Sequence, residues 1–153
     1  MDQTLHNGPP APSPVEPAPP ACAAYDGATS CIGAARRFAT AYLHRIHTEQ
    51  RTPLTRRAVG TAQLVVSELV TNACRYAPGP LRLDLRHLRH SLEITVWDTA
   101  AALPTAHAPD PSRIGRHGLE IVLAVCAHYD VQPTSGGKRT TAVLALTDPP
   151  AGR

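Results

Sequence analysis

Residues 64–73 read LVVSELVTNA, and the first part of this run is apolar almost all round a helix. Such a helix should pack on several sides. The spacing also places Glu68 and Asn72 on one face, with Arg75 one further turn along roughly the same edge. An acid, an amide and a guanidinium in line can accept a proton, ligate a hard cation and meet phosphate oxygens. The alternative is a helix edge that is simply wet.

Two helices are predicted in the first half of the chain. Apolar residues recur at three- and four-residue spacing from about Ser30 to Ile46, which predicts the first helix. The second should run over residues 54–76, with Thr52 as its cap and Pro53 at its first position, and should end before Pro78.

The second half alternates between strands and one helix. Leucine, isoleucine and valine alternate with polar residues in two stretches joined by a turn near Arg89-His90, which predicts an antiparallel hairpin. A long loop, another helix and two more strands follow. The order predicts an α+β fold: a two-layer sandwich with a mixed, mainly antiparallel sheet covered on one face by helices. The predicted ranges are strands 81–86 and 92–97, loop 99–114, helix 118–128 and strands 129–133 and 140–146.

The flanks and composition limit the class of protein. Seven prolines lie between Pro9 and Pro20, so residues 1–21 are predicted to be a disordered tail, with a proline-docking ligand as the alternative. The folded domain should then span residues 22–148, with a short tail at 149–153. A net charge of +3 without a basic cluster does not suggest nucleic-acid binding. No signal peptide or membrane span is evident, so a cytoplasmic protein with reduced cysteines is expected.

Two further places attract attention. Asp98 ends a predicted strand where the long loop begins, and its carboxylate could accept a hydrogen bond from an exocyclic amine, although Asp is also a common turn former. Gly115 and Gly118 open a predicted helix, whose backbone N–H groups could cradle phosphate. Plain helix capping is the alternative. A P-loop is absent, because Gly137-Lys138 is followed by Arg139.

Four segments together resemble the successive boxes of the gyrase, heat-shock chaperone and histidine-kinase ATPase superfamily. They stand in matching order and cover about residues 30–147. The likeness is to its compact form in bacterial anti-sigma-factor serine kinases, which carry an E-L-V-x-N-A motif and a Bergerat-type ATP-binding fold. The segments are SELVTNACRYA at 67–77, VWDTA at 96–100, GRHGLEIV at 115–122 and GKRTTA at 137–142.

The resemblance implies a role for each candidate residue. Asn72 would coordinate the magnesium that bridges the ATP phosphates, and Arg75 would contact phosphate. Asp98 would accept from the adenine amino group, with Thr140 supporting that contact through water. Gly115 and Gly118 would shape the lid over the phosphates. Glu68 would be the base that deprotonates a serine hydroxyl.

The implied function is an ATP-dependent protein serine/threonine kinase that phosphorylates an antagonist protein and sequesters a sigma factor, thereby regulating transcription. Its partners would be ATP, Mg²⁺ and those proteins, and a homodimer is compatible with the family. Histidine kinases usually carry Asn where Glu68 stands. The pattern departs from the family at Ala100, where a glycine is expected, and in the glycine-poor lid. The alternative is therefore an ATP-responsive binding module with weak or no phosphotransfer. A heat-shock-type ATPase is disfavoured by the missing middle domain.

Overall fold

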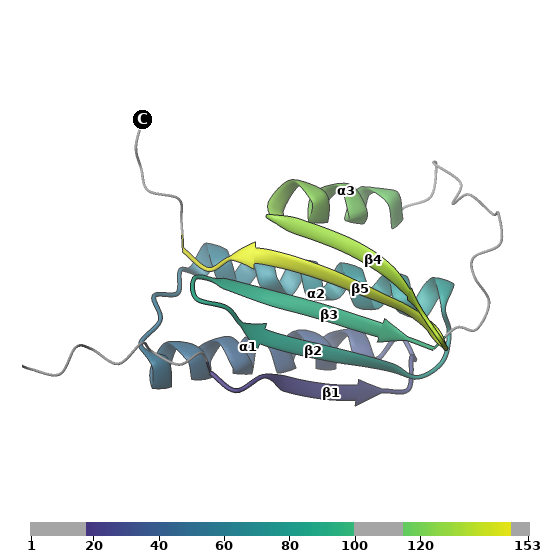
Figure 1. Ribbon diagram of the computed structural model, residues 1–153, viewed down its shortest axis with the longest axis horizontal. Helices are drawn as coiled ribbons and strands as arrows, with labels where there is room; N and C mark the ends of the chain where they lie inside the picture. The colour runs from purple at the N-terminus through teal and green to yellow at the C-terminus, as the bar shows by residue number, and fades with distance from the viewer. Residues whose placement is uncertain (1–17, 100–114, 148–153) are drawn as a thin grey trace, which may run out of the picture.

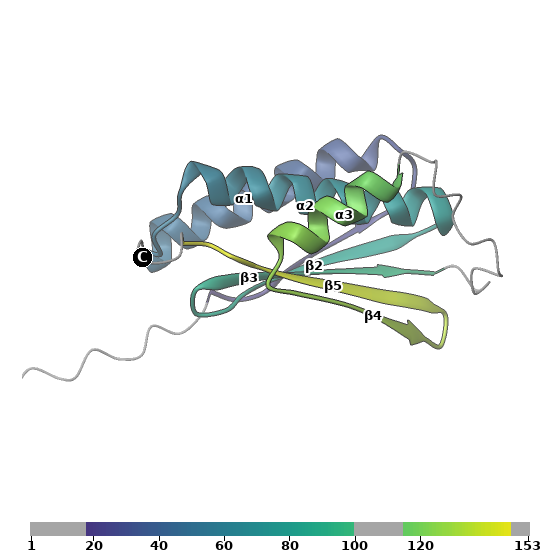
Figure 2. The ribbon, with the colours of Figure 1, turned by 90° about the horizontal axis from the view of Figure 1, so that it is seen from above.

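The computed structural model describes residues 18–99 and 115–147, which form two layers. Five antiparallel strands make one sheet in the order β1-β2-β3-β5-β4, and three helices cover one of its faces (Figures 1 and 2). This confirms the predicted α+β sandwich. The elements are β1 (Ala21–Tyr25), α1 (Cys31–Gln50), α2 (Arg56–Tyr76), β2 (Leu81–His87), β3 (Ser91–Asp98), α3 (Gly115–Val125), β4 (His128–Thr134) and β5 (Gly137–Ala145).

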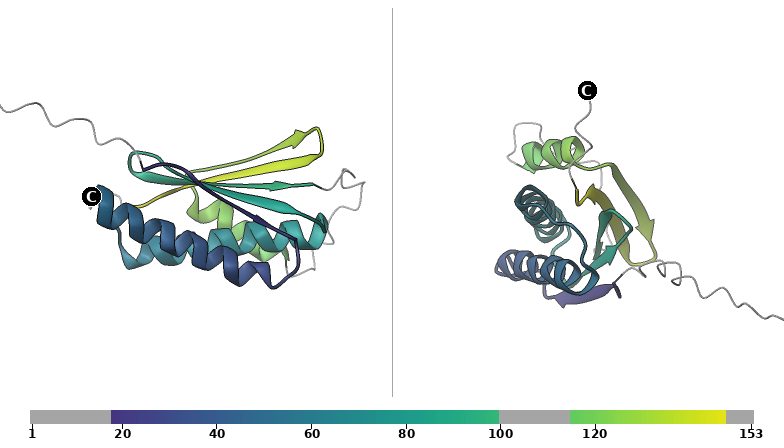
Figure 3. Two further views of the ribbon diagram at one scale, coloured as in Figure 1. Left: turned by 90° about the horizontal axis from the view of Figure 1, so that it is seen from below. Right: turned by 90° about the vertical axis from the view of Figure 1, so that its left-hand side faces the viewer.

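The core lies between the helices and the sheet, as Figure 3 shows end on. On the helix-facing side of the three central strands the side chains are aliphatic, because alternate residues of a strand point to the same face. The buried faces of α1 and α2 pack against them in one continuous cluster. The buried strand residues are Leu81, Leu83, Leu85, Leu92, Ile94, Val96, Ala142 and Leu144.

The start of α2 differs from the prediction. The capping residue is Thr55, whose side-chain oxygen accepts a hydrogen bond from the backbone N–H of Ala58 at 3.0 Å. The predicted cap, Thr52, is buried before the helix and its carbonyl oxygen lies 2.8 Å from Nδ1 of His47. Both threonines suit a cap, and the contact with α1 selects the later one.

Strand β1 was not predicted, and the predicted domain boundary at residue 22 falls inside it. Ala18 is buried, and its N–H donates to Nδ1 of His87 at 3.4 Å. The hydroxyl of Tyr42 donates to the carbonyl of Pro19 at 3.1 Å. The last residues of the predicted tail therefore pack against the domain. The disorder predicted for residues 1–17 lies outside the described residues, as do the loop residues 100–114 and the tail from 148.

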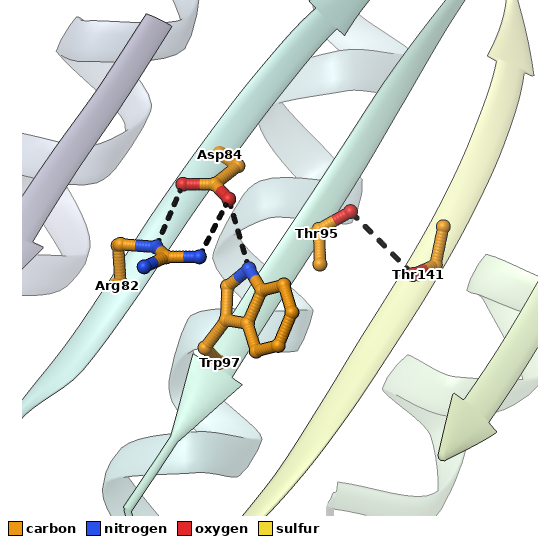
Figure 4. Close-up of polar contacts among 5 residues, drawn as sticks. All are labelled: Arg82, Asp84, Thr95, Trp97 and Thr141. Carbon is orange, nitrogen blue, oxygen red and sulfur yellow. Dashed lines mark hydrogen bonds and ion pairs between the residues drawn. The ribbon is translucent and has the colours of Figure 1, made fainter. Parts of the chain in front are cut away.

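The opposite face of the sheet carries no helix among the described elements and is polar (Figures 3 and 4). Trp97 lies between Arg82 and Arg139 of the neighbouring strands, whose guanidinium carbons are 4.7 and 5.4 Å from its ring centroid. Asp84 accepts hydrogen bonds from the Trp97 indole at 2.8 Å and from Arg82 at 3.0 and 3.1 Å. Cross-strand pairs of this kind stabilise a sheet face without burying it.

All four cysteines are free thiols. The Sγ atoms of Cys31 on α1 and Cys74 on α2 lie 3.6 Å apart. Burial raises the pKa of the Cys74 thiol to about 11, so it remains protonated at neutral pH. Both residues thus pack the two helices together as small hydrophobes. None of the helices among the described residues is long and apolar enough to cross a membrane.

Two glycines allow the loop after β1 to touch the loop before β2. Gly27 has a φ of +89° and Gly79 a φ of +134°, both in the region that favours glycine. A Cβ on Gly27 would lie 2.8 Å from the carbonyl carbon and 2.9 Å from the nitrogen of Gly79, so the two backbones are in direct contact. Beside them the Thr99 hydroxyl donates to the carbonyl of Pro80 at 2.7 Å. At this end of the sheet the two loops therefore pack backbone against backbone.

Gly27→Ala should destabilise the domain by about 2 kcal/mol or more, since it combines a strained φ with a backbone overlap. The measurement is urea unfolding followed by circular dichroism. Gly60→Ala is the matched control: position 60 lies within α2 with nothing within 4 Å of an added Cβ, and the change should stabilise by about 0.5–1 kcal/mol. Equal effects of the two changes would contradict the contact between Gly27 and Gly79.

Candidate functional site

The candidate residues lie on four elements whose ends meet at one end of the domain. β3 ends and β5 begins there as paired strands, α2 runs into β2 at the same end, and α3 begins there (Figure 1). The chain thus brings together segments that are far apart in sequence. The residues are Glu68, Asn72 and Arg75 on α2, Asp98 on β3, Gly115 and Gly118 on α3 and Thr140 on β5.

Asp98 is the most deeply buried acid of this group, at 5% exposure. It is opposite Lys138 in the β3–β5 register and shares the helix-facing side of the sheet with Val96. Its Oδ1 accepts a hydrogen bond from the backbone N–H of Lys138 at 3.1 Å, and its Oδ2 forms an ion pair with the Lys138 ammonium at 2.6 Å. A buried carboxylate needs such partners, because burying an unpaired charge is costly.

Thr140 belongs to the same part of the sheet. It is buried at 8% exposure and lies opposite Val96, one diagonal step from Asp98 on the same face. The register therefore brings Asp98 and Thr140 together, as the sequence prediction requires.

Glu68 is brought against the first turn of α3. Gly118 is buried there, and a Cβ at this position would lie 2.5 Å from Cδ of Glu68 and would overlap its Oε2. An added Cβ would therefore require the Glu68 carboxylate, the end of a flexible side chain, to move. The Glu68 side chain is half-buried rather than fully wet. Two of the predicted site residues, Glu68 on α2 and Gly118 on α3, are thus in contact.

Asn72 and Arg75 continue along α2 from Glu68. Asn72 is half-buried and Arg75 is exposed in the last turn, where a cation also suits the negative end of the helix dipole. No side-chain hydrogen bond links either group to another described residue.

The residues present suit a nucleotide with its metal. A half-buried amide oxygen can ligate Mg²⁺, which keeps most of its other ligands as water and phosphate. Among the described residues, no three His, Cys, Asp or Glu side chains gather as a metal cage. Asp98 supplies an acceptor for an exocyclic amine, although Lys138 already contacts both of its oxygens.

A groove of about 670 Å³ lies elsewhere, on the open polar face of the sheet. Trp97, Asp84 and Arg139 are among its lining residues. Because neighbouring residues of a strand point to opposite faces, Trp97 faces away from Asp98. This groove is therefore separate from the group of candidate residues.

Lys138 was not predicted as a site residue, although it lies in the GKRTTA segment at 137–142. Its contact with Asp98 depends on the pairing of two strands that are forty positions apart in sequence. The signal that could have found it is the hairpin turn at Ser135-Gly136, which fixes the β4–β5 register, together with the end of β3 at Asp98.

The model of the histidine kinase-like ATPase domain family matches residues 29–144. No curated protein matches the chain at a significant level. Among solved structures, the chain is similar to the histidine kinase domain of the blue-light activated histidine kinase from Erythrobacter litoralis EL346. That match has 22% identity and a TM-score of 0.46, and it covers 77% of this chain and 60% of that one.

The family match spans most of the chain, including α1–α3 and β2–β4 and nearly all of β5. It contains every candidate residue from Glu68 to Thr140. The chain therefore belongs to the family of histidine kinase-like ATPase domains, which bind ATP.

Proposed function

We propose that this protein is an ATP-dependent serine/threonine protein kinase of the anti-sigma-factor type, acting in the cytoplasm on an antagonist protein and sequestering a sigma factor. The observation that carries the proposal is the contact between Glu68 and Gly118. It places a half-buried carboxylate on α2 directly beside the first turn of α3, the helix start that would hold the phosphates. A base for the acceptor hydroxyl is needed at that place.

Glu68 would act as general base. ATP supplies the γ-phosphoryl group, and Mg²⁺ neutralises its charge. As the serine oxygen forms its bond to phosphorus, the hydroxyl proton passes to the Glu68 carboxylate and the bond to the ADP oxygen breaks. Gly118 would leave room for the carboxylate beside α3, because it carries no Cβ.

Asn72 and Arg75 would serve the phosphates. Asn72 is one helical turn from Glu68 on the same face, so its amide oxygen would hold the metal near the base. Arg75, exposed in the last turn of α2, would meet phosphate oxygens with its planar fork of donors. Gly115 begins α3 and would present backbone N–H groups to the phosphates together with Gly118.

Asp98 and Thr140 would hold the purine. Both are buried on the helix-facing side of the sheet and are diagonal neighbours across β3 and β5. A carboxylate accepts only, so it suits the amino group of adenine.

The second candidate function is an ATP-responsive binding module with little phosphotransfer. The Lys138 ammonium on Asp98 favours it, because a carboxylate with an internal cation is a weaker acceptor for adenine. The two candidates differ in whether phosphate leaves ATP, which the following experiments measure.

Asp98→Asn should weaken ATP binding in the presence of Mg²⁺ by about tenfold, the effect of losing a hydrogen bond to a charged group worth about 1.5 kcal/mol. Isothermal titration calorimetry measures the dissociation constant. The matched control is Asp84→Asn, the same chemical change on the open face of the sheet, where Asp84 bonds Trp97 and Arg82. Unchanged affinity in Asp98→Asn would refute the adenine assignment.

Glu68→Gln should keep ATP binding but reduce phosphate transfer by about 100-fold or more, as expected when a general base is removed. Proteins that co-purify with the tagged chain would be incubated with γ-labelled ATP, and phosphoserine would be located by mass spectrometry. Glu93→Gln, which removes an acid paired with Arg86 on the open face, is the control and should transfer at the normal rate. Transfer by Glu68→Gln at the wild-type rate would show that Glu68 is not the base.

The contact between Glu68 and Gly118 can be tested by a double-mutant cycle. Gly118→Ala should be less favourable in the wild-type domain than a glycine-to-alanine change within a helix otherwise is, because the new Cβ displaces the Glu68 carboxylate. In a Glu68→Ala background the same change should cost less, giving a coupling energy of about 1 kcal/mol. Urea unfolding of the four proteins measures it. Additive effects would mean that the two residues do not touch in solution.

A further inference from the structure

The acceptor proposed for adenine already has an internal partner. Lys138 contacts both oxygens of the Asp98 carboxylate, one through its backbone N–H at 3.1 Å and the other through its ammonium at 2.6 Å. In the first contact the donor is a backbone N–H, whose position the β3–β5 pairing fixes. The second depends on a flexible side chain with four rotatable bonds. Only the ammonium can therefore leave without disturbing the strands.

The surroundings leave the carboxylate little other access. The Asp98 side chain is 3% exposed, whereas that of Lys138 is 32% exposed. A Cβ on Gly137 would lie 2.8 Å from Oδ1 of Asp98, so the backbone of β5 closes that side. The ammonium occupies Oδ2, on the side that the backbone does not close. A ligand amine that needs this oxygen meets Lys138 first.

We propose that Lys138 is a specificity-determining residue of the purine site. Its ammonium competes with the 6-amino group of adenine for Asp98, and it donates to the 6-oxo group of other purines. This inference rests on the proposed nucleotide-binding function and concerns a residue outside the roles assigned above. Lys138 thus lowers the affinity for ATP and narrows the preference for ATP over 6-oxo purine nucleotides.

The chemistry of the two purine classes explains the second effect. Adenine presents an amino group at position 6, which donates to a carboxylate. Inosine presents a carbonyl oxygen there, which a carboxylate repels and to which an ammonium donates a hydrogen bond. A site with Asp98 alone should discriminate strongly, because a buried acceptor facing a carbonyl is left unpaired. The same site with Lys138 beside Asp98 can satisfy either group.

The test compares ATP with inosine triphosphate, which differs from ATP only in its base. Dissociation constants with Mg²⁺ would be measured by calorimetry for the wild-type chain, Lys138→Met and Lys138→Gln. We expect Lys138→Met to bind ATP about tenfold more tightly and to bind inosine triphosphate no better, the scale of one hydrogen bond to a charged group. Lys138→Gln keeps a neutral donor, so its dissociation constant for ATP should lie between those of the wild-type chain and Lys138→Met. It replaces Lys138→Met in the test if that variant fails to fold.

The control is Arg86→Met, which removes the same charge from the open face, where Arg86 is 61% exposed. It should leave the ratio of the two constants unchanged, whereas a general effect of net charge would move both variants alike. Weaker or equal ATP binding by both Lys138 variants, with an unchanged ratio, would overturn the inference. Failure of the wild-type chain to bind ATP at all would instead overturn the proposed function, so the two failures are distinguishable.

Discussion

The pairing of β3 with β5 is the constraint on which the candidate site depends. With Val96 opposite Thr140 and Asp98 opposite Lys138, the register puts an acid, a hydroxyl and a cation on the helix-facing side of the sheet. A slip of either strand by one residue would turn its own members of this group to the open face. The aliphatic residues of the strands prevent this, because Leu92 and Ile94 earlier in β3, or Leu144 later in β5, would then lose their place in the core. Hydrophobic burial thereby fixes the position of a polar group at the strand end.

The second constraint is the closeness that glycine permits. Gly118 admits the Glu68 carboxylate beside the first turn of α3, and Gly137 lets the backbone of β5 close on Asp98. In both places the missing side chain makes room for an acid of the chain itself. A glycine near the start of a helix can therefore have a reason other than phosphate binding. Gly118 leaves room for the Glu68 carboxylate whether or not a ligand is bound.

Periodicity predicted the three helices, the four later strands and the two layers, because each has a clear apolar face. Strand β1 was not predictable in this way: its sequence, ACAAY, contains no β-branched residue and follows a proline-rich stretch, and it forms because β2 offers an edge. Thr55 was missed as the cap because Thr52 has the same chemistry and only the contact with His47 separates them. The motif residues were found from the sequence, but the partner of Asp98 required the strand register.

Lys138 also bears on the choice between an enzyme and a binding module. Buried carboxylates are tolerated only with partners, so an adenine-reading acid must be satisfied both with and without its ligand. An internal ammonium provides this in the free protein and, in the proposed site, would compete with the purine. Binding of ATP would then exchange one partner for another instead of adding a contact, which would limit affinity but leave Glu68 untouched on the neighbouring helix. Weak nucleotide binding and active phosphotransfer would therefore be compatible in the proposed site, since they would depend on different carboxylates.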